Sequence, residues 1–427
     1  MALMNIVINV TLWIVYILSL YFSVFLFLIF IDKKNFFSTE ESSINLAREP
    51  YVSVFVPAYN EEKTIVKTLQ SIDNLDYPHE KIEVIVIDDG SKDRTRSIIE
   101  EHMKDKPNYR MISRPNKGKA ASLNDALKAA NGEFFACLDA DSFVHRDTLR
   151  KMLALYEKEN DERLAIITPA MKVHDPKTVL EKIQWLEYLV IILISRISSH
   201  LDSLYVAPGP FSLYRTEIIR KIGGFDETSI TEDQEIAYRV QKENYRIKQC
   251  FDGYVFTTAP SKLKPFYRQR RRWYLGSIIC LHQYKEMVAN RKYGDFGMMQ
   301  MIKNVAGYLL ATAGIFIAVY LFIIPAWNYL KSGWLIRFEI MPILKNLDFS
   351  ITMMDLLTID FKRTFIIISL FMIGFYFFYQ AHKNANEKVM KFGIIPLLPY
   401  FLFYYLLKGI ILLMSLTKFT AKQKLRW

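Results

Sequence analysis

Residues 134–141, FFACLDAD, decide the fold, because an apolar run leads directly into two carboxylates one residue apart. The run is typical of a parallel strand that is buried on both faces. Ligands of open α/β sheets bind outside the carboxyl ends of the strands, so we expect Asp139 and Asp141 there, on the same side of extended backbone. Two such carboxylates repel each other unless a cation lies between them. The stretch predicts Mg²⁺ or Mn²⁺ bridging a diphosphate, and a polar turn after a strand is the alternative.

Three further apolar strand patterns precede this stretch and alternate with helical patterns. The strands are expected at Val52–Val56, Ile82–Ile87 and Tyr109–Ser113, and a helix over Ala120–Ala130 precedes the fourth strand. Strands separated by helices of this length predict an α/β fold with a mostly parallel sheet and right-handed crossovers. A dinucleotide-binding fold has no sequence support, because no Gly-x-Gly-x-x-Gly follows the first strand.

Every strand of this predicted sheet ends in polar residues at the same edge. They are Tyr59, Asn60 and Glu61 after the first strand, Asp88 and Asp89 after the second, Lys117 and Lys119 after the third, and Asp139 and Asp141 after the fourth. An aromatic face with an acidic acceptor suits a nucleobase and ribose, and a lysine with a metal suits phosphates. Turn chemistry explains each loop alone, but four converging loops predict a site for a nucleoside diphosphate.

The composition predicts a chain that lies partly in a membrane. Its 427 residues are too many for one simple core. It is 51% hydrophobic, with 30 Phe and 25 Tyr, yet carries 55 Lys and Arg and a net charge of +11. This charge would also suit nucleic acid, but no recognition motif or uninterrupted basic tract supports that class. The three cysteines lie far apart, which argues against a disulfide framework or metal site and for a reducing compartment.

Long apolar segments lie toward both ends of the sequence. Residues 1–34 predict an N-terminal transmembrane helix, and Lys33 and Lys34 place its end on the cytoplasmic side. The candidate spans of the C-terminal region are Val305–Tyr329, Thr364–His382 and Phe392–Thr417, and Met341–Leu357 is expected as an interfacial helix. Three spans after a cytoplasmic domain would place the basic C-terminal tail outside, against the positive-inside tendency.

Two explanations of the basic tail stay open. Either the last segment, which Pro396, Pro399 and Lys408 interrupt, doubles back, or a further span lies within 335–360. A lysine inside a span usually faces a cavity or pairs with another group. Lys408 is therefore consistent with a polymer path, with snorkelling and with a bend.

The stretch Val179–Ser199 is amphipathic at its start and apolar later. Its internal charges, Glu187 and Arg196 among them, argue against a full membrane span. We expect an interfacial helix, with a buried core helix as the alternative.

The residues after the predicted strands resemble those of the inverting family 2 glycosyltransferases, which have a nucleotide-sugar-binding fold called GT-A. The resemblance rests on Pro57-Ala58-Tyr59-Asn60-Glu61, Asp88-Asp89-Gly90-Ser91 and Asp139-Ala140-Asp141. It implies that Pro57, Tyr59, Glu61 and Asp89 hold the uridine, that Lys119 contacts the diphosphate, and that Asp139 with Asp141 binds metal and phosphate.

Two later motifs extend the resemblance to the acceptor side. Thr231-Glu232-Asp233 precedes a helical pattern, and an N-cap followed by acids in the first turn explains it without any function. The motif is also similar to the Thr-Glu-Asp of processive family members, which implies that Asp233 is the base for the acceptor hydroxyl and that Glu232 contacts the acceptor. The loop around Gly209 is similar to the family's acceptor-side loop, which implies that Gly209 lines the acceptor pocket.

The most specific motif is Gln269-Arg270-Arg271-Arg272-Trp273, within a basic amphipathic stretch. A membrane-surface helix explains the arginines but not Gln and Trp at this spacing. Arginine neutralises a diphosphate by bidentate hydrogen bonds, and tryptophan offers a platform for a sugar ring. Gln-x-x-Arg-Trp is the signature of cellulose, chitin, hyaluronan and poly-N-acetylglucosamine synthases. The resemblance implies donor contacts for Gln269 and Arg272 and an acceptor contact for Trp273.

The expected domains are an N-terminal transmembrane helix at 1–34, a linker at 35–50, a cytoplasmic GT-A catalytic domain at 51–260, interfacial helices at 261–300 and a transmembrane region at 301–427. The expected enzyme is inverting, uses Mg²⁺ or Mn²⁺, and polymerises a UDP-sugar onto a growing glycan that it carries across the cell membrane. The partners expected are the donor, the glycan and the bilayer, without nucleic acid, and an accessory secretion partner stays open. The alternatives are a non-processive transferase that places one sugar on a lipid carrier, and a transport or scaffold protein with a vestigial sheet.

Overall fold

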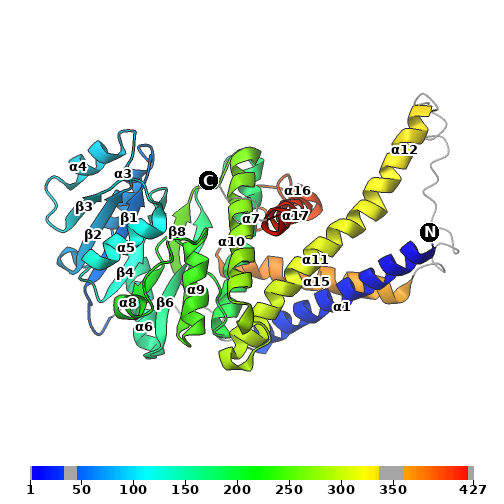
Figure 1. Ribbon diagram of the computed structural model, residues 1–427, viewed down its shortest axis with the longest axis horizontal. Helices are drawn as coiled ribbons and strands as arrows, with labels where there is room; N and C mark the ends of the chain where they lie inside the picture. Colours follow the sequence, from blue (N-terminus) through cyan, green and yellow to red (C-terminus); the bar gives the residue numbers. More distant parts are fainter. Residues whose placement is uncertain (1, 33–45, 336–359, 422–427) are drawn as a thin grey trace.

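An eight-stranded mixed sheet is the central element of the computed structural model, which describes residues 2–32, 46–335 and 360–421. Its strand order is β3-β2-β1-β4-β7-β6-β8-β5 (Figure 1). The strands are β1 (Val52–Ala58), β2 (Ile82–Asp88), β3 (Tyr109–Ser113), β4 (Phe134–Cys137), β5 (Ser142–Val144), β6 (Leu164–Val173), β7 (Leu213–Arg215) and β8 (Arg246–Thr257). β1, β2, β3 and β4 pair in parallel, as do β6 and β8, whereas β7 is antiparallel to both of its neighbours and β5 to β8. The predicted α/β fold with a mostly parallel sheet is confirmed.

Helices cover both faces of the sheet because its strands alternate apolar side chains between the faces. One layer consists of α3 (Ile65–Asp73), α4 (Thr95–Met103) and α6 (Thr148–Glu159), and the other of α5 (Lys119–Ala129), α8 (Thr216–Lys221) and α9 (Glu232–Lys242). On β1, Val54 and Val56 pack toward the first layer and Phe55 toward the second. Phe55 stacks on Phe135, which stacks on Tyr214, with ring centroids 4.7 and 4.8 Å apart. This ladder fixes β1, β4 and β7 side by side.

Two helices, α7 (Val179–His200) and α10 (Leu263–Gln283), stand between the sheet and the apolar helices (Figure 1). α7 begins with a capping box, in which the Thr178 hydroxyl accepts from the Glu181 N–H and the Glu181 carboxylate accepts from the Thr178 N–H. Trp185, Leu189 and Ile197 of α7 are buried, and the helix packs on β6, β8 and α15 (Phe361–Asn384). Its burial favours a core helix over the expected interfacial one.

Three long apolar segments project from this layer, each with one end near the sheet (Figure 1). They are α1 (Ala2–Asp32), the run Phe296–Trp334 that includes α11 (Ile302–Ala318) and α12 (Ile324–Leu335), and α15. α1 lies against α15 and α11. The end of α15 is tied to the sheet, because Lys172 of β6 donates to the Ala385 carbonyl at 2.8 Å and pairs with Glu387 at 3.7 Å.

The fourth apolar segment, Leu397–Thr420, includes α16 (Leu397–Pro399) and α17 (Tyr405–Thr420) and is also long enough to cross a membrane. It packs against α10, and Figure 1 shows α17 nearly end-on while α10 stands upright and α1, α11 and α15 run across the view. Lys408 of α17 pairs with Glu187 of α7, so its partner in the structure is a carboxylate. The expected helix Met341–Leu357 and the alternative span within 335–360 fall outside the described residues.

Candidate active site

The loops after β1 and β2 are joined by hydrogen bonds at the carboxyl edge of the sheet. The Asn60 backbone N–H donates to the Ser91 hydroxyl at 3.1 Å, and the Lys92 N–H donates to the Asn60 side-chain carbonyl at 2.8 Å. Asn60 has a φ of 57°, a conformation that asparagine tolerates better than most residues. The neighbouring Tyr59 remains 42% exposed, so its aromatic face is accessible to a ligand, as its predicted role in uridine binding requires.

Asp88 and Asp89, both buried, have separate structural roles. Asp88 accepts from the Ser91 N–H at 3.0 Å and shapes the turn after β2. Asp89 accepts from the Lys117 and Gly118 N–H groups at 3.1 and 2.9 Å, which holds the loop before α5. Asp89 is therefore the carboxylate that joins two of the loops at this edge, and its contact with the uridine stays a prediction.

The Asp139-Ala140-Asp141 segment is a turn, so the expectation of extended backbone there was wrong. β4 ends at Cys137, the Ser142 N–H donates to the Asp139 carbonyl at 2.9 Å, and β5 begins at Ser142. The reason is the antiparallel pairing of β5 with β8, which turns the chain away from β4. Burial, together with the negative charges of Asp139 and Glu61, raises the pKa of Asp141 to about 6.

The acidic turn fits a metal only together with a substrate. Among residues 2–32, 46–335 and 360–421, no group of three or more His, Cys, Asp or Glu side chains is arranged to hold an ion. Two carboxylates whose mutual repulsion raises a pKa do suit a divalent cation that also takes oxygen ligands from phosphates. The side chains present are thus compatible with Mg²⁺ or Mn²⁺ bound jointly with a diphosphate.

Lys119, at the start of α5, connects the acidic turn to the acceptor-side motif. Its ammonium lies 2.5 Å from an Asp139 oxygen and 3.0 Å from an oxygen of Glu232. Burial opposes the charge on Lys119, but Asp139, Glu232 and Asp233 outweigh it and raise its pKa well above the usual value. A Cβ on Gly209 would lie 2.6 Å from the Lys119 nitrogen, which shows how closely the Gly209 backbone covers this ion pair. The structure therefore brings Gly209 into the candidate site.

The Thr231-Glu232-Asp233 motif begins α9, as predicted. Thr231 occupies the N-cap position but makes no capping hydrogen bond with its side chain. Instead it packs on α10 so closely that a Cβ on Gly276 would lie 2.3 Å from its hydroxyl oxygen. Burial and the neighbouring Glu232 carboxylate raise the pKa of Asp233 to about 6, while Lys119 and Arg272 act to lower it. Asp233 is therefore ionised at neutral pH and more basic than an ordinary aspartate.

The side chains of the Gln-x-x-Arg-Trp motif lie on α10 and differ in their surroundings. Arg272 is exposed, but close enough to stabilise the ionised forms of Glu232 and Asp233. The Gln269 side-chain carbonyl is buried without a hydrogen-bond partner, an unusual state for a polar atom. Trp273 is half-buried, and the Arg270 guanidinium lies 4.2 Å from its ring centroid. The structure thus brings Arg272 to the acidic cluster, and it places Trp273 beside Arg270.

The comparisons with known proteins decide the family. Residues 53–223 match the family described as "Glycosyl transferase family 2". The chain carries a family 2 glycosyltransferase domain. This confirms the predicted family, and the matched range contains the strand-end loops and the acidic turn and ends before α9.

Curated relatives of this glycosyltransferase extend the similarity beyond the matched domain. A poly-β-1,6-N-acetyl-D-glucosamine synthase of Staphylococcus epidermidis is 27% identical over 376 residues, which cover 87% of this chain and 84% of the relative. The synthase of the same name from Staphylococcus aureus (strain COL) is 30% identical over 251 residues, covering 56% of this chain and 60% of the relative. The membrane class is supported as well, because the described residues contain four helices long and apolar enough to cross a bilayer.

One solved structure supports the fold of the glycosyltransferase domain. A mannosyltransferase from Pyrobaculum calidifontis, PcManGT, solved in complex with GDP-Man and Mn²⁺, covers 75% of this chain and 91% of its own length with a TM-score of 0.56. Its sequence is 21% identical, so the similarity establishes the shared fold.

Glu187 and Lys408, each a charged residue within a largely apolar segment, form an ion pair that was not predicted. Both side chains, with Arg270 and Tyr404, form one cluster between α7, α10 and the segment that includes α17. The available signal was an acid in one largely apolar segment and a base in another, since such charges are expected to pair. Their pairing across more than two hundred positions of sequence was not deducible from either segment alone.

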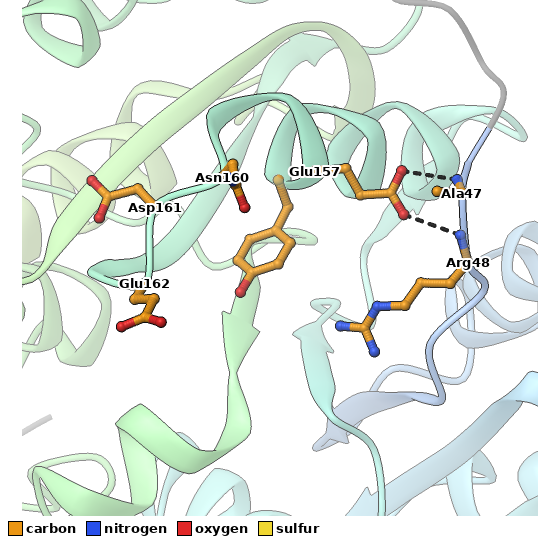
Figure 2. A pocket seen from close by; sticks show the side chains of 7 residues that line it. Ala47, Arg48, Glu157, Asn160, Asp161 and Glu162 are labelled. Carbon is orange, nitrogen blue, oxygen red and sulfur yellow. Dashed lines mark hydrogen bonds between the residues drawn. The ribbon is translucent and has the colours of Figure 1, made fainter.

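A surface pocket away from the strand-end loops contains none of the predicted site residues. It is lined by Ala47, Arg48, Tyr156, Glu157, Asn160, Asp161 and Glu162 (Figure 2). The Glu157 carboxylate accepts from the Ala47 and Arg48 N–H groups at 3.0 and 3.2 Å. These residues precede β1 and β6, so the pocket lies at the amino ends of strands, opposite the candidate active site.

Proposed function

We propose that this glycosyltransferase polymerises N-acetylglucosamine from UDP-N-acetylglucosamine into a β-1,6-linked glycan. The observation that carries the proposal is the Lys119 ion-pair cluster, which joins Asp139 of the donor side to Glu232, the neighbour of Asp233. This proximity supports a transfer in which a base and a leaving diphosphate lie on two sides of one sugar. The sugar and the linkage are inferred from the name of the synthase that matches 87% of this chain.

The proposed reaction is a direct displacement at the anomeric carbon. Asp233 takes the proton from the acceptor hydroxyl, whose oxygen forms the new bond as the bond to UDP breaks, so the configuration inverts. A pKa of about 6 suits this role, because the carboxylate is ionised at neutral pH yet basic enough to accept a proton. Arg272 and Lys119 neutralise the charge that develops on the departing diphosphate.

The other donor contacts follow from the placement of the loops. Pro57, Tyr59, Glu61 and Asp89 are proposed to hold the uridine. Gln269, whose buried side-chain carbonyl has no hydrogen-bond partner, is proposed to contact the donor. Asp139 and Asp141 would hold Mg²⁺ or Mn²⁺, which supplies further charge neutralisation to the diphosphate when bound.

The orientation in the membrane is proposed from the directions of the apolar helices. α1, the run Phe296–Trp334 and α15 each start or end beside the sheet domain and extend away from it. α17 instead stays against α10 and holds Lys408 at Glu187. Three crossings, with α17 lying at the membrane surface, would place the sheet domain and the basic C-terminal tail together in the cytoplasm. This arrangement satisfies the positive-inside tendency.

We further propose that synthesis is processive and coupled to transport of the glycan. The support is the contact of α10, which carries Trp273, with α17, and the contact of α11 with α17. An acceptor held at Trp273 would therefore lie one helix, α17, away from α11, one of the three proposed crossings.

The test of the proposed function uses the full chain in nanodiscs with Mg²⁺ or Mn²⁺. UDP release and product length are followed with UDP-N-acetylglucosamine, UDP-glucose and UDP-glucuronate, singly and in pairs. A long polymer from UDP-N-acetylglucosamine alone is expected, and Asp233→Asn should abolish it while donor binding persists. A single sugar on a lipid would refute processivity, and a polymer from another donor would refute the assigned sugar.

A further inference from the structure

A buried carboxylate in the middle of α7 joins three elements on the acceptor side of the site. The exposed fraction of the Glu187 side chain is 5%, and both of its carboxylate oxygens accept hydrogen bonds from buried or half-buried side chains. One oxygen accepts from the Arg270 guanidinium at 2.5 Å and from the Tyr404 hydroxyl at 2.6 Å. The other accepts from the Lys408 ammonium at 2.5 Å. Glu187 therefore connects α7 to α10 and to the C-terminal segment.

The surroundings make α7 the fixed member of this cluster. α7 packs on β6 and β8, and its capping box holds its start. Burial acts to raise the pKa of Glu187, but Lys408 and Arg270 outweigh it, so the pKa stays below the usual value and the carboxylate is ionised. A single buried anion that faces two cations is costly to maintain without a specific role, because apolar residues of the same volume would pack at least as well.

The cluster reaches the acceptor-side motif through Arg270. Arg270 and Trp273 are three residues apart on α10 and so lie on the same face of the helix. The Arg270 guanidinium lies 4.2 Å from the Trp273 ring centroid and 5.2 Å from that of Phe266. The guanidinium thus contacts the aromatic ring on which the acceptor sugar is proposed to stack, while its charge is held by Glu187.

We propose that Glu187 is a positioning residue that sets the orientation of the Trp273 ring through Arg270. This inference rests on the proposed role of Trp273 in acceptor binding. Lys408 extends the same contact to α17, so the acceptor platform and the C-terminal helix share one anchor. Neutral glutamine at position 187 would leave Arg270 and Lys408 facing each other as like charges, and the guanidinium would leave the ring.

The test is a double-mutant cycle between Glu187→Gln and Trp273→Phe in the full chain in nanodiscs. Glu187→Gln is expected to raise the KM for a β-1,6-linked N-acetylglucosamine oligosaccharide about tenfold. This is the effect expected from losing one cation–π contact that aligns the Trp273 ring. The KM for the donor should stay within about twofold. In the Trp273→Phe background, Glu187→Gln should have a smaller effect, because a phenyl ring holds the guanidinium more weakly than an indole ring does.

The controls separate positioning from folding. Glu217→Gln changes a carboxylate on α8 whose side chain is 86% exposed, and it should leave both KM values unchanged. Glu187→Asp should recover part of the acceptor affinity. If Glu187→Gln does not fold, Glu187→Gln with Lys408→Met restores the net charge of the cluster and is used in the same cycle.

Two kinetic results would overturn the proposal. One is acceptor kinetics of a folded Glu187→Gln protein that match the wild type, and the other is full additivity with Trp273→Phe. Failure of the proposed function is distinguishable, because it shows as absence of polymer in the wild type. The contribution of Trp273 to the fluorescence, taken as the difference from the Trp273→Phe form, then reports the position of the Trp273 ring without any need for enzyme activity. An unchanged contribution in Glu187→Gln would refute the positioning role.

Discussion

Lowering the pH from about 7.5 to about 5 is expected to slow sugar transfer roughly tenfold at saturating donor, acceptor and metal. Burial and the Glu232 carboxylate raise the pKa of Asp233 to about 6. At about one pH unit below that value, roughly a tenth of the carboxylate remains ionised. Only the ionised form can take the acceptor proton, so activity is kept above pH 6 and lost as the pH falls through it.

Lys119 supplies the second half of this prediction. Its ammonium favours the ionised form of Asp233, so Lys119→Met is expected to move the inflection to higher pH. The assay is the initial rate of UDP release. Metal affinity falls in the same range, because the pKa of Asp141 is also raised to about 6, and saturating metal removes that contribution. A rate that is flat down to about pH 5, or an inflection that moves downward in Lys119→Met, would refute the reasoning.

Three further outcomes are expected. Gly276→Ala should reduce the rate of sugar transfer at least tenfold with little loss of donor binding, because the added Cβ would lie 2.3 Å from the Thr231 hydroxyl. Gly307→Ala is the matched control, because open space surrounds Gly307. Equal transfer rates in the two variants would contradict the prediction. Gly209→Ala should weaken donor binding measured calorimetrically, because the added Cβ would lie only 2.6 Å from the Lys119 nitrogen and would displace the ammonium. An unchanged affinity would count against the predicted contact of Lys119 with the diphosphate. Chelation of divalent cations should abolish UDP release, with recovery on adding Mn²⁺ or Mg²⁺, whereas full activity in a chelator would exclude the metal role.

The sequence predicted the parallel half of the fold well because its strands are short, buried and apolar on both faces. β1, β2, β3 and β4 lie where their patterns indicated, and the polar loops do collect at one edge. The strands β5 and β8 were not predicted, because β5 has three residues and its partner lies more than a hundred positions away. For that reason Asp139 and Asp141 were expected on extended backbone, and the turn was only the alternative.

The sequence predicted which residues lie near one another in the site better than it predicted which side chains form ion pairs. Gly209, Glu232 and Asp233 lie beside Lys119, as a shared site requires. The contact of Lys119 with Asp139 was not expected, because a sequence motif shows which charges are present but not how they pair. The Glu187 cluster was not predicted for the same reason, since it forms between three helices that are distant in sequence.

The antiparallel pairing of β5 with β8 has a consequence for biosynthesis. The acidic turn is held between β4 and β5, and β5 obtains its hydrogen bonds from Val255, Phe256 and Thr257. During translation, β5 therefore lacks its strand partner until Thr257 has left the ribosome, long after β1 to β4 are able to pair. A nascent chain that stalls near the end of the matched range, residue 223, would expose the edge of β6 that β8 later covers. Such an edge is open to pairing with other chains, so the pairing of β5 and the protection of the β6 edge occur in the same late step, the arrival of β8.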